Sequence, residues 1–142
     1  MGNRAVITIK NEHIPKDDWT SLYLHWNGGR DSVVPFLKVA KLYGIRCNVD
    51  PSYGIARLCQ LIGNWIGGTY SLGVGKYTTY HKESLDNGVY IIDNWEIVDR
   101  EFFEGEEQNE YDEEEFIKDI RAVNDKIFGH EENNVTEIHV YK

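Results

Sequence analysis

Short runs of β-branched or alternating apolar residues predict about five strands. They fall at residues 5–10, 21–26, 70–75, 89–92 and 95–100. The last two runs flank Asp93-Asn94, which favours a tight connection and therefore a hairpin. Residues 135–141 alternate again, so the segment 130–142 is expected to be either a further strand or a loosely held tail.

Three longer segments carry apolar residues at helical spacing. The first is expected to begin at Asp31 or Ser32 as the N-cap and to end at Gly44. The second begins at Asp50-Pro51, a capping carboxylate followed by proline at the first helical position, and ends at residues 67–68. The third begins at Asp112, closes at Gly129, and has an apolar face made of Phe116, Ile120, Val123 and Ile127.

The order of these segments predicts an α+β fold. Two strands precede two helices, several strands joined by short turns follow, and a helix comes last. Short connections between neighbouring strands favour a mainly antiparallel sheet, here of about five strands with three helices on one side. No linker or internal repeat divides residues 1–142, which are expected to form a single domain.

Composition narrows the class of protein. Hydrophobic residues make up 41% of the 142 residues and aromatic residues 13%, which excludes a largely disordered chain. Cys47 and Cys59 belong to no CxxC pattern and are expected to be free thiols. No apolar run approaches the roughly 18 residues of a membrane span, and no signal-like segment opens the sequence. We therefore expect no membrane association and a location in the cytoplasm.

Charge is distributed unevenly along the chain. Residues 1–71 carry 5 acidic and 8 basic side chains, a net charge of +3, and residues 72–142 carry 19 acidic and 7 basic, a net charge of −12. Within residues 93–115, 12 carboxylates accompany a single basic side chain, that of Arg100. Such asymmetry bears on partners and association rates more than on the fold.

This acidic stretch has two interpretations. In the first, carboxylates imitate the phosphates of a nucleic acid and occupy a basic groove on a partner, with interleaved aromatic residues as anchors. In the second, the stretch is a solvated loop leading into a helix start, where glutamates suit the helix dipole. The first interpretation assigns partner binding to Asp93, Trp95, Glu96, Asp99, Glu101, Phe102, Phe103, Glu104, Glu106, Glu107, Glu110, Tyr111, Glu113 and Glu114.

A second candidate site lies at residues 25–31, where a strand runs through glycines into a helix. Backbone N–H groups at such a junction can hold an anion, and the candidate anion-binding residues are Asn27, Gly28, Gly29 and Arg30. His25, Arg30 and Asp31 would then be the catalytic candidates. The alternative is a turn that needs glycine, with Asp31 as a helix cap and Arg30 in a salt bridge.

Known catalytic and metal-binding patterns are missing from the sequence. The five histidines show no HxxxH or HExxH spacing, the carboxylates follow no EF-hand order, and no nucleophile elbow is present. We therefore expect no metal and no cofactor, and a protein that is not an enzyme is favoured over a catalyst.

Several strings of residues resemble a family of small acidic proteins carried by phages and integrative elements of Gram-positive bacteria. They are GNRAVIT at 2–8, YLHWNGGRDSV at 23–33, YGIARLCQ at 53–60, DNGVYII at 86–92 and EEQNEYD at 106–112. The resemblance covers residues 2–115 and carries over no catalytic residue. It implies the context of a mobile element, whose small acidic accessory proteins often inhibit host defence machinery, including CRISPR nucleases.

Together these observations favour an anti-CRISPR-like inhibitor that binds a host nucleic-acid-handling protein, such as a CRISPR effector, through its acidic surface. One alternative is a small phosphate-binding enzyme, a nuclease or nucleotide hydrolase, centred on residues 25–31. Another is a structural or assembly component of the element. Direct binding to nucleic acid is disfavoured because a chain with a net charge of −9 is repelled by phosphates. The sequence sets no oligomeric state.

Overall fold

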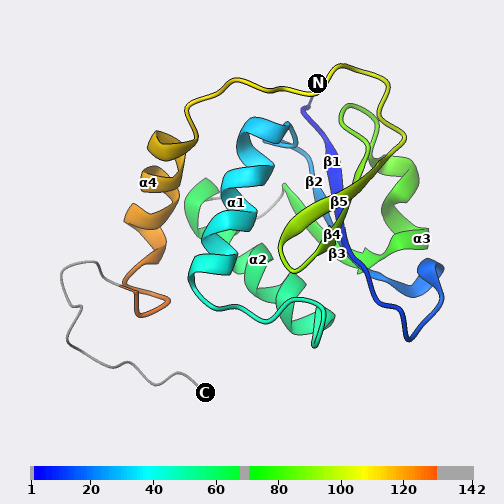
Figure 1. The fold of residues 1–142 in the computed structure, drawn as a ribbon, viewed down its shortest axis with the longest axis horizontal. Helices are drawn as coiled ribbons and strands as arrows, with labels where there is room; N and C mark the ends of the chain where they lie inside the picture. Colours follow the sequence, from blue (N-terminus) through cyan, green and yellow to red (C-terminus); the bar gives the residue numbers. More distant parts are fainter. Residues whose placement is uncertain (1, 68–70, 131–142) are drawn as a thin grey trace.

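The computed structural model describes residues 2–67 and 71–130 and has a five-stranded mixed sheet at its centre (Figure 1). From one edge of the sheet to the other the order is β3-β2-β1-β4-β5. The strands are β1 (Ala5–Ile9), β2 (Thr20–Leu24), β3 (Leu72–Lys76), β4 (Val89–Asp93) and β5 (Glu96–Glu101).

Three of the four strand pairs are antiparallel, and only β1 and β4 run parallel. The expected α+β class and mainly antiparallel sheet are therefore confirmed. The parallel pair is made possible by the long connection between β1 and β4, which contains β2, α1, α2, β3 and α3, because parallel neighbours need a crossover. The hairpin expected at Asp93-Asn94 joins β4 to β5, and Asn94 and Trp95 both have the positive φ angles that a tight hairpin turn requires.

All three expected helices are present as α1 (Arg30–Leu42), α2 (Pro51–Ile66) and α4 (Glu113–Asn124). A fourth helix, α3 (Tyr77–Tyr80), continues into a 3-10 turn at His81–Glu83 and was not expected from the sequence. Four residues are too few to show a helical period, and the segment lies between alternating residues that favour a strand.

Side-chain caps form at two of the three long helices. Asp50 accepts a hydrogen bond from the backbone N–H of Tyr53, and Asp112 accepts one from that of Glu115. The expected cap of α1 by Asp31 or Ser32 is wrong, because α1 begins at Arg30 with Gly29 at the N-cap position and no side-chain cap there. The chain turns into the helix earlier than expected because Gly28 and Gly29 pack closely against other segments.

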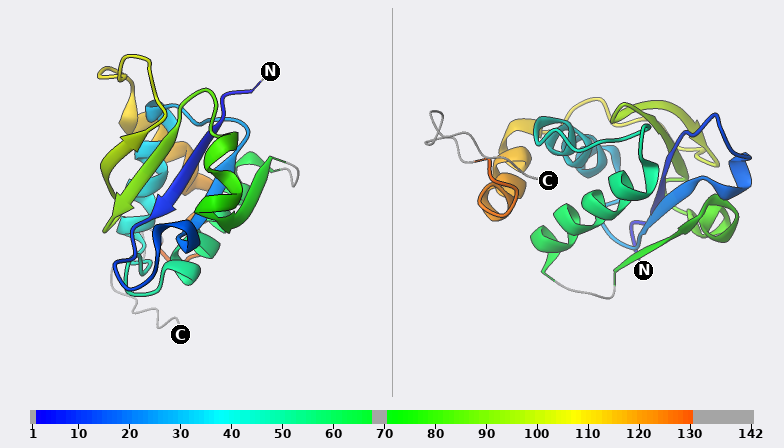
Figure 2. Two further views of the ribbon diagram at one scale, coloured as in Figure 1. Left: turned by 90° about the vertical axis from the view of Figure 1, so that its right-hand side faces the viewer. Right: turned by 90° about the horizontal axis from the view of Figure 1, so that it is seen from below.

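Figure 2 shows the sheet between the long helices on one face and α3 on the other. Alternate residues of β1 point to opposite faces, so Ala5, Ile7 and Ile9 join the main core with α1 and α2 while Val6 packs against Tyr77 of α3. Helix α4 lies on the outside of α1 and α2 (Figure 1), and its contribution to the fully buried core is Ile120.

Some residues that the apolar patterns placed on a buried face are exposed or lie outside the expected element. Val123 of α4 is more exposed than Ile120 of the same helix, and Ile127 lies beyond the end of that helix. Trp26 lies beyond the end of β2 and has 43% of its surface exposed.

Cys47 and Cys59 are free thiols. The strand or tail expected at 135–141 lies outside the described residues. Among the described helices, none is long and apolar enough to cross a membrane.

Candidate functional site

The two candidate regions of the sequence meet at one end of the sheet. The end of β2 leads into residues 25–31, and the end of β5 leads into residues 102–112, which we call the acidic strap. The strap crosses this end of the molecule and passes the start of α1 before it enters α4 (Figure 1). The structure therefore joins two segments that are about 75 residues apart in sequence, such as Asp31 and Gln108.

Gly28 is needed because the start of β1 packs directly against it. Its N–H donates to the carbonyl oxygen of Asn3 at 2.8 Å, and its own carbonyl accepts a hydrogen bond from the Tyr90 hydroxyl at 2.7 Å. A Cβ atom at Gly28 would lie 2.5 Å from the Asn3 oxygen. The backbone groups of Gly28 are thus already used within the fold, which favours the structural interpretation of this glycine.

The start of α1 is occupied by side chains of the acidic strap. The backbone N–H of Asp31 donates to Oε1 of Gln108 at 3.1 Å, and the Arg30 guanidinium lies 4.0 Å from a Glu107 carboxylate oxygen. Gly29 allows this approach, since a Cβ there would lie 3.0 Å from the same Gln108 oxygen. The groups that were expected to bind an external anion therefore contact oxygens of the chain itself.

The three catalytic candidates do not form one hydrogen-bonded group. His25 shares a hydrogen bond of 2.8 Å between its Nδ1 and the hydroxyl of Tyr23. Within the described residues, no hydrogen bond or ion pair joins His25 to Arg30 or Asp31. A nucleophile–base or base–orienter contact of the kind that marks a catalytic constellation is thus not formed by these three side chains.

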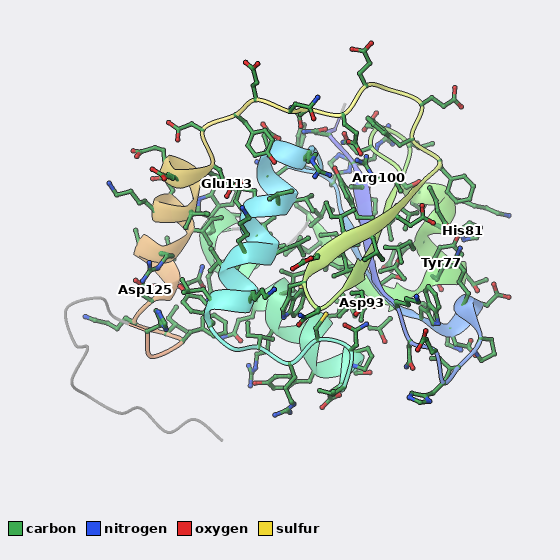
Figure 3. All side chains as sticks on the ribbon, viewed as in Figure 1. Tyr77, His81, Asp93, Arg100, Glu113 and Asp125 are labelled. Atoms are coloured by element: carbon green, nitrogen blue, oxygen red, sulfur yellow. The ribbon has the colours of Figure 1, made fainter. Side chains whose placement is uncertain are left out.

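Arg100 holds the strap against the sheet. Its guanidinium carbon lies 3.9 Å from the centre of the Tyr90 ring and 4.1 Å from that of Phe103. The same guanidinium donates to the carbonyl of Asn87 at 2.6 Å and forms an ion pair with Glu107. In Figure 3, Arg100 and Glu113 lie near the two ends of the strap. The sequence signal that could have identified Arg100 is its position as the one basic residue among the 12 carboxylates of residues 93–115.

Two phenols beside this site are held neutral. Burial raises the pKa of Tyr90, whose hydroxyl donates to Gly28. Burial, followed by the hydrogen bond to Glu101, raises the pKa of Tyr77, whose hydroxyl lies 2.6 Å from that carboxylate. Both hydroxyls therefore act as donors, and neither has the lowered pKa expected of an activated acid or base.

Four of the 12 carboxylates between residues 93 and 115 are bound by cations of the first half of the chain. These ion pairs join β5, the strap and the start of α4 to α1 and to the loop before β2. The pairs are Lys16–Glu101, Arg30–Glu107, Lys38–Glu113 and Lys41–Glu96. Some of the opposite charges in the two halves of the sequence thus form ion pairs that attach one half to the other.

Five further carboxylates of β5, the strap and α4 are exposed and hold no ion pair in the described part of the chain. Within residues 2–67 and 71–130, no cation lies within ion-pair distance of Asp99, Glu104, Glu106, Glu110 or Glu114, and all five are exposed. Phe102, at the start of the strap, has 61% of its surface exposed and a φ of 59°, and it lines a shallow hollow with His81, Lys82, Ser84 and Leu85. A non-glycine residue at positive φ is uncommon, and here it directs a large apolar side chain toward solvent.

Not every residue assigned to partner binding lies on this surface. Trp95 is 4% exposed, belongs to the main core and donates its indole N–H to the carbonyl of Ile45 at 2.7 Å. Its assignment as an anchor for a partner is therefore wrong, because the hairpin turns its ring inward. Phe103 is half-buried against Arg100, and Asp93 and Tyr111 are also half-buried. Sequence alternation alone could not separate Trp95 from Phe102.

A cleft of about 510 Å³ lies between α1, β5 and the end of the strap. Its walls carry Arg30, Lys38 and Lys41 of α1, facing Glu96 and Glu113, and its apolar lining includes Leu37 and Ile97. The cations that line it are already paired with carboxylates of the same chain. Among the described residues, no three His, Cys, Asp or Glu side chains come together as ligands for a metal ion.

Comparison of this chain with protein-family models, with curated proteins and with solved structures finds no match.

Proposed function

We propose that this protein is an accessory inhibitor of a phage or mobile element. It binds a host nucleic-acid-handling defence protein, such as a CRISPR effector, and the binding surface is formed by Asp99, Phe102, Glu104, Glu106, Glu110 and Glu114. The observation that carries the proposal is the set of exposed carboxylates without ion-pair partners among the described residues along the strap, which has the exposed ring of Phe102 at its start. Such a surface is complementary to a basic groove with an apolar pocket.

The attachment of the strap supports binding over simple solvation. Arg100 contacts Phe103 and pairs with Glu107, Arg30 lies at ion-pair distance from Glu107, and Gln108 accepts a hydrogen bond from the start of α1. A segment that is already ordered loses less conformational entropy when a partner binds it than a free tail does. The strap backbone is therefore held near Phe103, Glu107 and Gln108, which lowers the ordering cost of presenting its free carboxylates to a partner.

The enzyme alternative receives no comparable support. The backbone groups of Gly28 and the N–H of Asp31 in the first turn of α1 are engaged by Asn3, Tyr90 and Gln108, and His25 stands apart from Arg30 and Asp31. We therefore prefer the binding function.

Charge reversal tests this proposal. The variant Glu104→Lys, Glu106→Lys, Glu110→Lys and Glu114→Lys changes only carboxylates that hold no ion pair in the described structure, so the fold is expected to be retained. We expect the wild-type protein, used as bait in bacterial lysate at low salt, to enrich a nucleic-acid-binding protein identified by mass spectrometry. The reversed variant should lose that partner and any inhibition of the partner's activity.

The control carries the same change in charge at other exposed carboxylates: Glu12→Lys, Asp17→Lys, Glu83→Lys and Asp119→Lys. It should keep the partner if the strap is the binding surface, and lose it if net charge alone is responsible. Retained inhibition in the strap variant would show that binding uses another surface.

A further inference from the structure

The two edges of the sheet differ in how they are protected from other chains. At one edge, β5 carries the charged residues Glu96 and Asp99, and its pairing with β4 contains an irregularity between Ile91 and Ile92. Charges and bulges at an edge strand prevent pairing with another chain. At the opposite edge, β3 pairs regularly with β2 along its whole length and has neither proline nor an internal charge.

The register of β3 identifies the backbone groups that are left free. The register continues beyond both ends of β3 to the opposite pairs His25–Ser71 and Trp19–Tyr77, each joined by one hydrogen bond, from His25 N to Ser71 O and from Tyr77 N to Trp19 O. Since hydrogen-bonded pairs alternate along an antiparallel ladder, the N–H and C=O groups of the intervening residues of β3 point away from β2. These residues are Leu72, Val74 and Lys76.

The side chains of β3 leave this edge open. The side chain of Tyr80 packs directly against the backbone of Gly73 and Gly75. A Cβ atom would lie 2.5 Å from the Tyr80 hydroxyl oxygen at Gly73 and 2.8 Å from a ring carbon at Gly75. Val74 sits in the middle of the strand with 51% of its surface exposed, and Lys76 at its end is paired with Asp18. Within the described residues, no strand covers the outer side of β3.

We propose that β3 is a self-association edge, where a second copy of this chain adds its own β3 in antiparallel orientation. The five-residue strand is self-complementary about Val74. With Val74 opposite Val74 of the second copy, Leu72 of each chain faces Lys76 of the other, so all the outward-pointing backbone groups find partners. The result is one continuous sheet across the two chains.

Charge favours a second copy at this edge over the opposite one. β3 and β5 are separated by four strand spacings, which is roughly 19 Å at about 4.8 Å per strand. This exceeds the Debye length of about 8 Å at physiological salt, so the acidic straps of the two copies repel each other little. In the pairing about Val74 no two like charges stand directly opposite each other. The proposal is independent of what the acidic strap binds.

The mass in solution tests this inference. We expect light scattering after size exclusion to show a mass that rises with concentration toward twice the 16.5 kDa of the chain. Val74→Lys places two ammonium groups opposite each other at the two-fold axis and should return the mass to that of one chain. Val98→Lys is the matched control, because Val98 lies in the other edge strand with a similar exposure of 53%.

A cross-link tests the register itself. Opposed Cα atoms of a hydrogen-bonded pair are about 5.5 Å apart, within the range that a disulfide spans. Val74→Cys should therefore form a covalent dimer under mild oxidation, and Val98→Cys should not. A wild-type protein that stays at 16.5 kDa at every concentration, or a dimer that Val74→Lys leaves intact, would overturn the proposal.

Discussion

At the scale of single residues, Arg100 has the most specific environment at the candidate site. Its planar guanidinium lies between two aromatic rings and also donates to the Asn87 carbonyl and to Glu107. Lysine keeps the charge but cannot lie as a flat group between two rings, and it lacks the rigid fork of donors that the guanidinium presents. We expect Arg100→Lys to lower the free energy of unfolding by about 1–2 kcal/mol, measured by chemical denaturation.

The control is Arg46→Lys. Arg46 also lies over an aromatic ring, that of Tyr53 at 4.2 Å, and pairs with Asp50, but its side chain is 56% exposed. Exposed pairs contribute about 0–1 kcal/mol, so its replacement should have a smaller effect. If both variants lost the same free energy of unfolding, the burial of Arg100 between Tyr90 and Phe103 would not contribute to stability.

At the scale of elements, α2 contains two glycines with opposite roles. A Cβ atom at Gly54 would lie 2.6 Å from the Arg46 carbonyl oxygen, whereas one at Gly63 would make only an ordinary contact of 3.5 Å with Leu72. Glycine inside a helix costs about 1 kcal/mol relative to alanine unless packing requires it. We expect Gly63→Ala to raise the free energy of unfolding by about 0.5–1 kcal/mol and Gly54→Ala to lower it by about 1–3 kcal/mol.

Thermal and chemical denaturation of the two single variants measure this difference directly. Each variant serves as the control for the other, since the substitution and the helix are the same. If both variants were more stable than the wild type, the backbone at Gly54 would have room for a methyl group, and the predicted clash with the Arg46 carbonyl oxygen would be wrong.

At the scale of the whole molecule, several groups resist deprotonation in the fold. Burial, and then the hydrogen bond to Asp125, raises the pKa of Tyr43, burial raises that of Tyr90, and burial raises the pKa of Cys47 to about 11. A group whose pKa is raised in the folded state contributes its full stability below its ordinary pKa. That contribution is lost as the pH rises above the ordinary value, about 8.5 for a thiol and 10 for a phenol.

We therefore expect the free energy of unfolding to fall steeply above about pH 9–10, by up to 1.4 kcal/mol per pH unit for each such group. Denaturation curves recorded from pH 7 to 11 measure this slope. Tyr43→Phe removes one of these titrating groups and should make the slope shallower. A stability that stays level up to pH 11 would contradict the prediction.

The local elements could largely be predicted because their signals are local. Asp50-Pro51 at the start of α2, Asp112 at the start of α4 and Asp93-Asn94 in the hairpin each specify the backbone within a few residues. The failures came where a distant segment decided the outcome. The start of α1 depends on the contact of Gly28 with Asn3, and α3 is a four-residue helix that packs on the far face of the sheet.

The sequence by itself determined the class of fold, the long helices and the concentration of carboxylates between residues 93 and 115. It did so because hydrophobic period, turn residues and charge are read along the chain. Only the tertiary structure decided which carboxylates are free, since Lys16, Arg30, Lys38 and Lys41 reach across the fold to neutralise four of them. Only tertiary packing could bury Trp95 against the loop at Ile45 while Phe102 stays exposed, and only the pairing of distant strands could place β3 at an edge of the sheet.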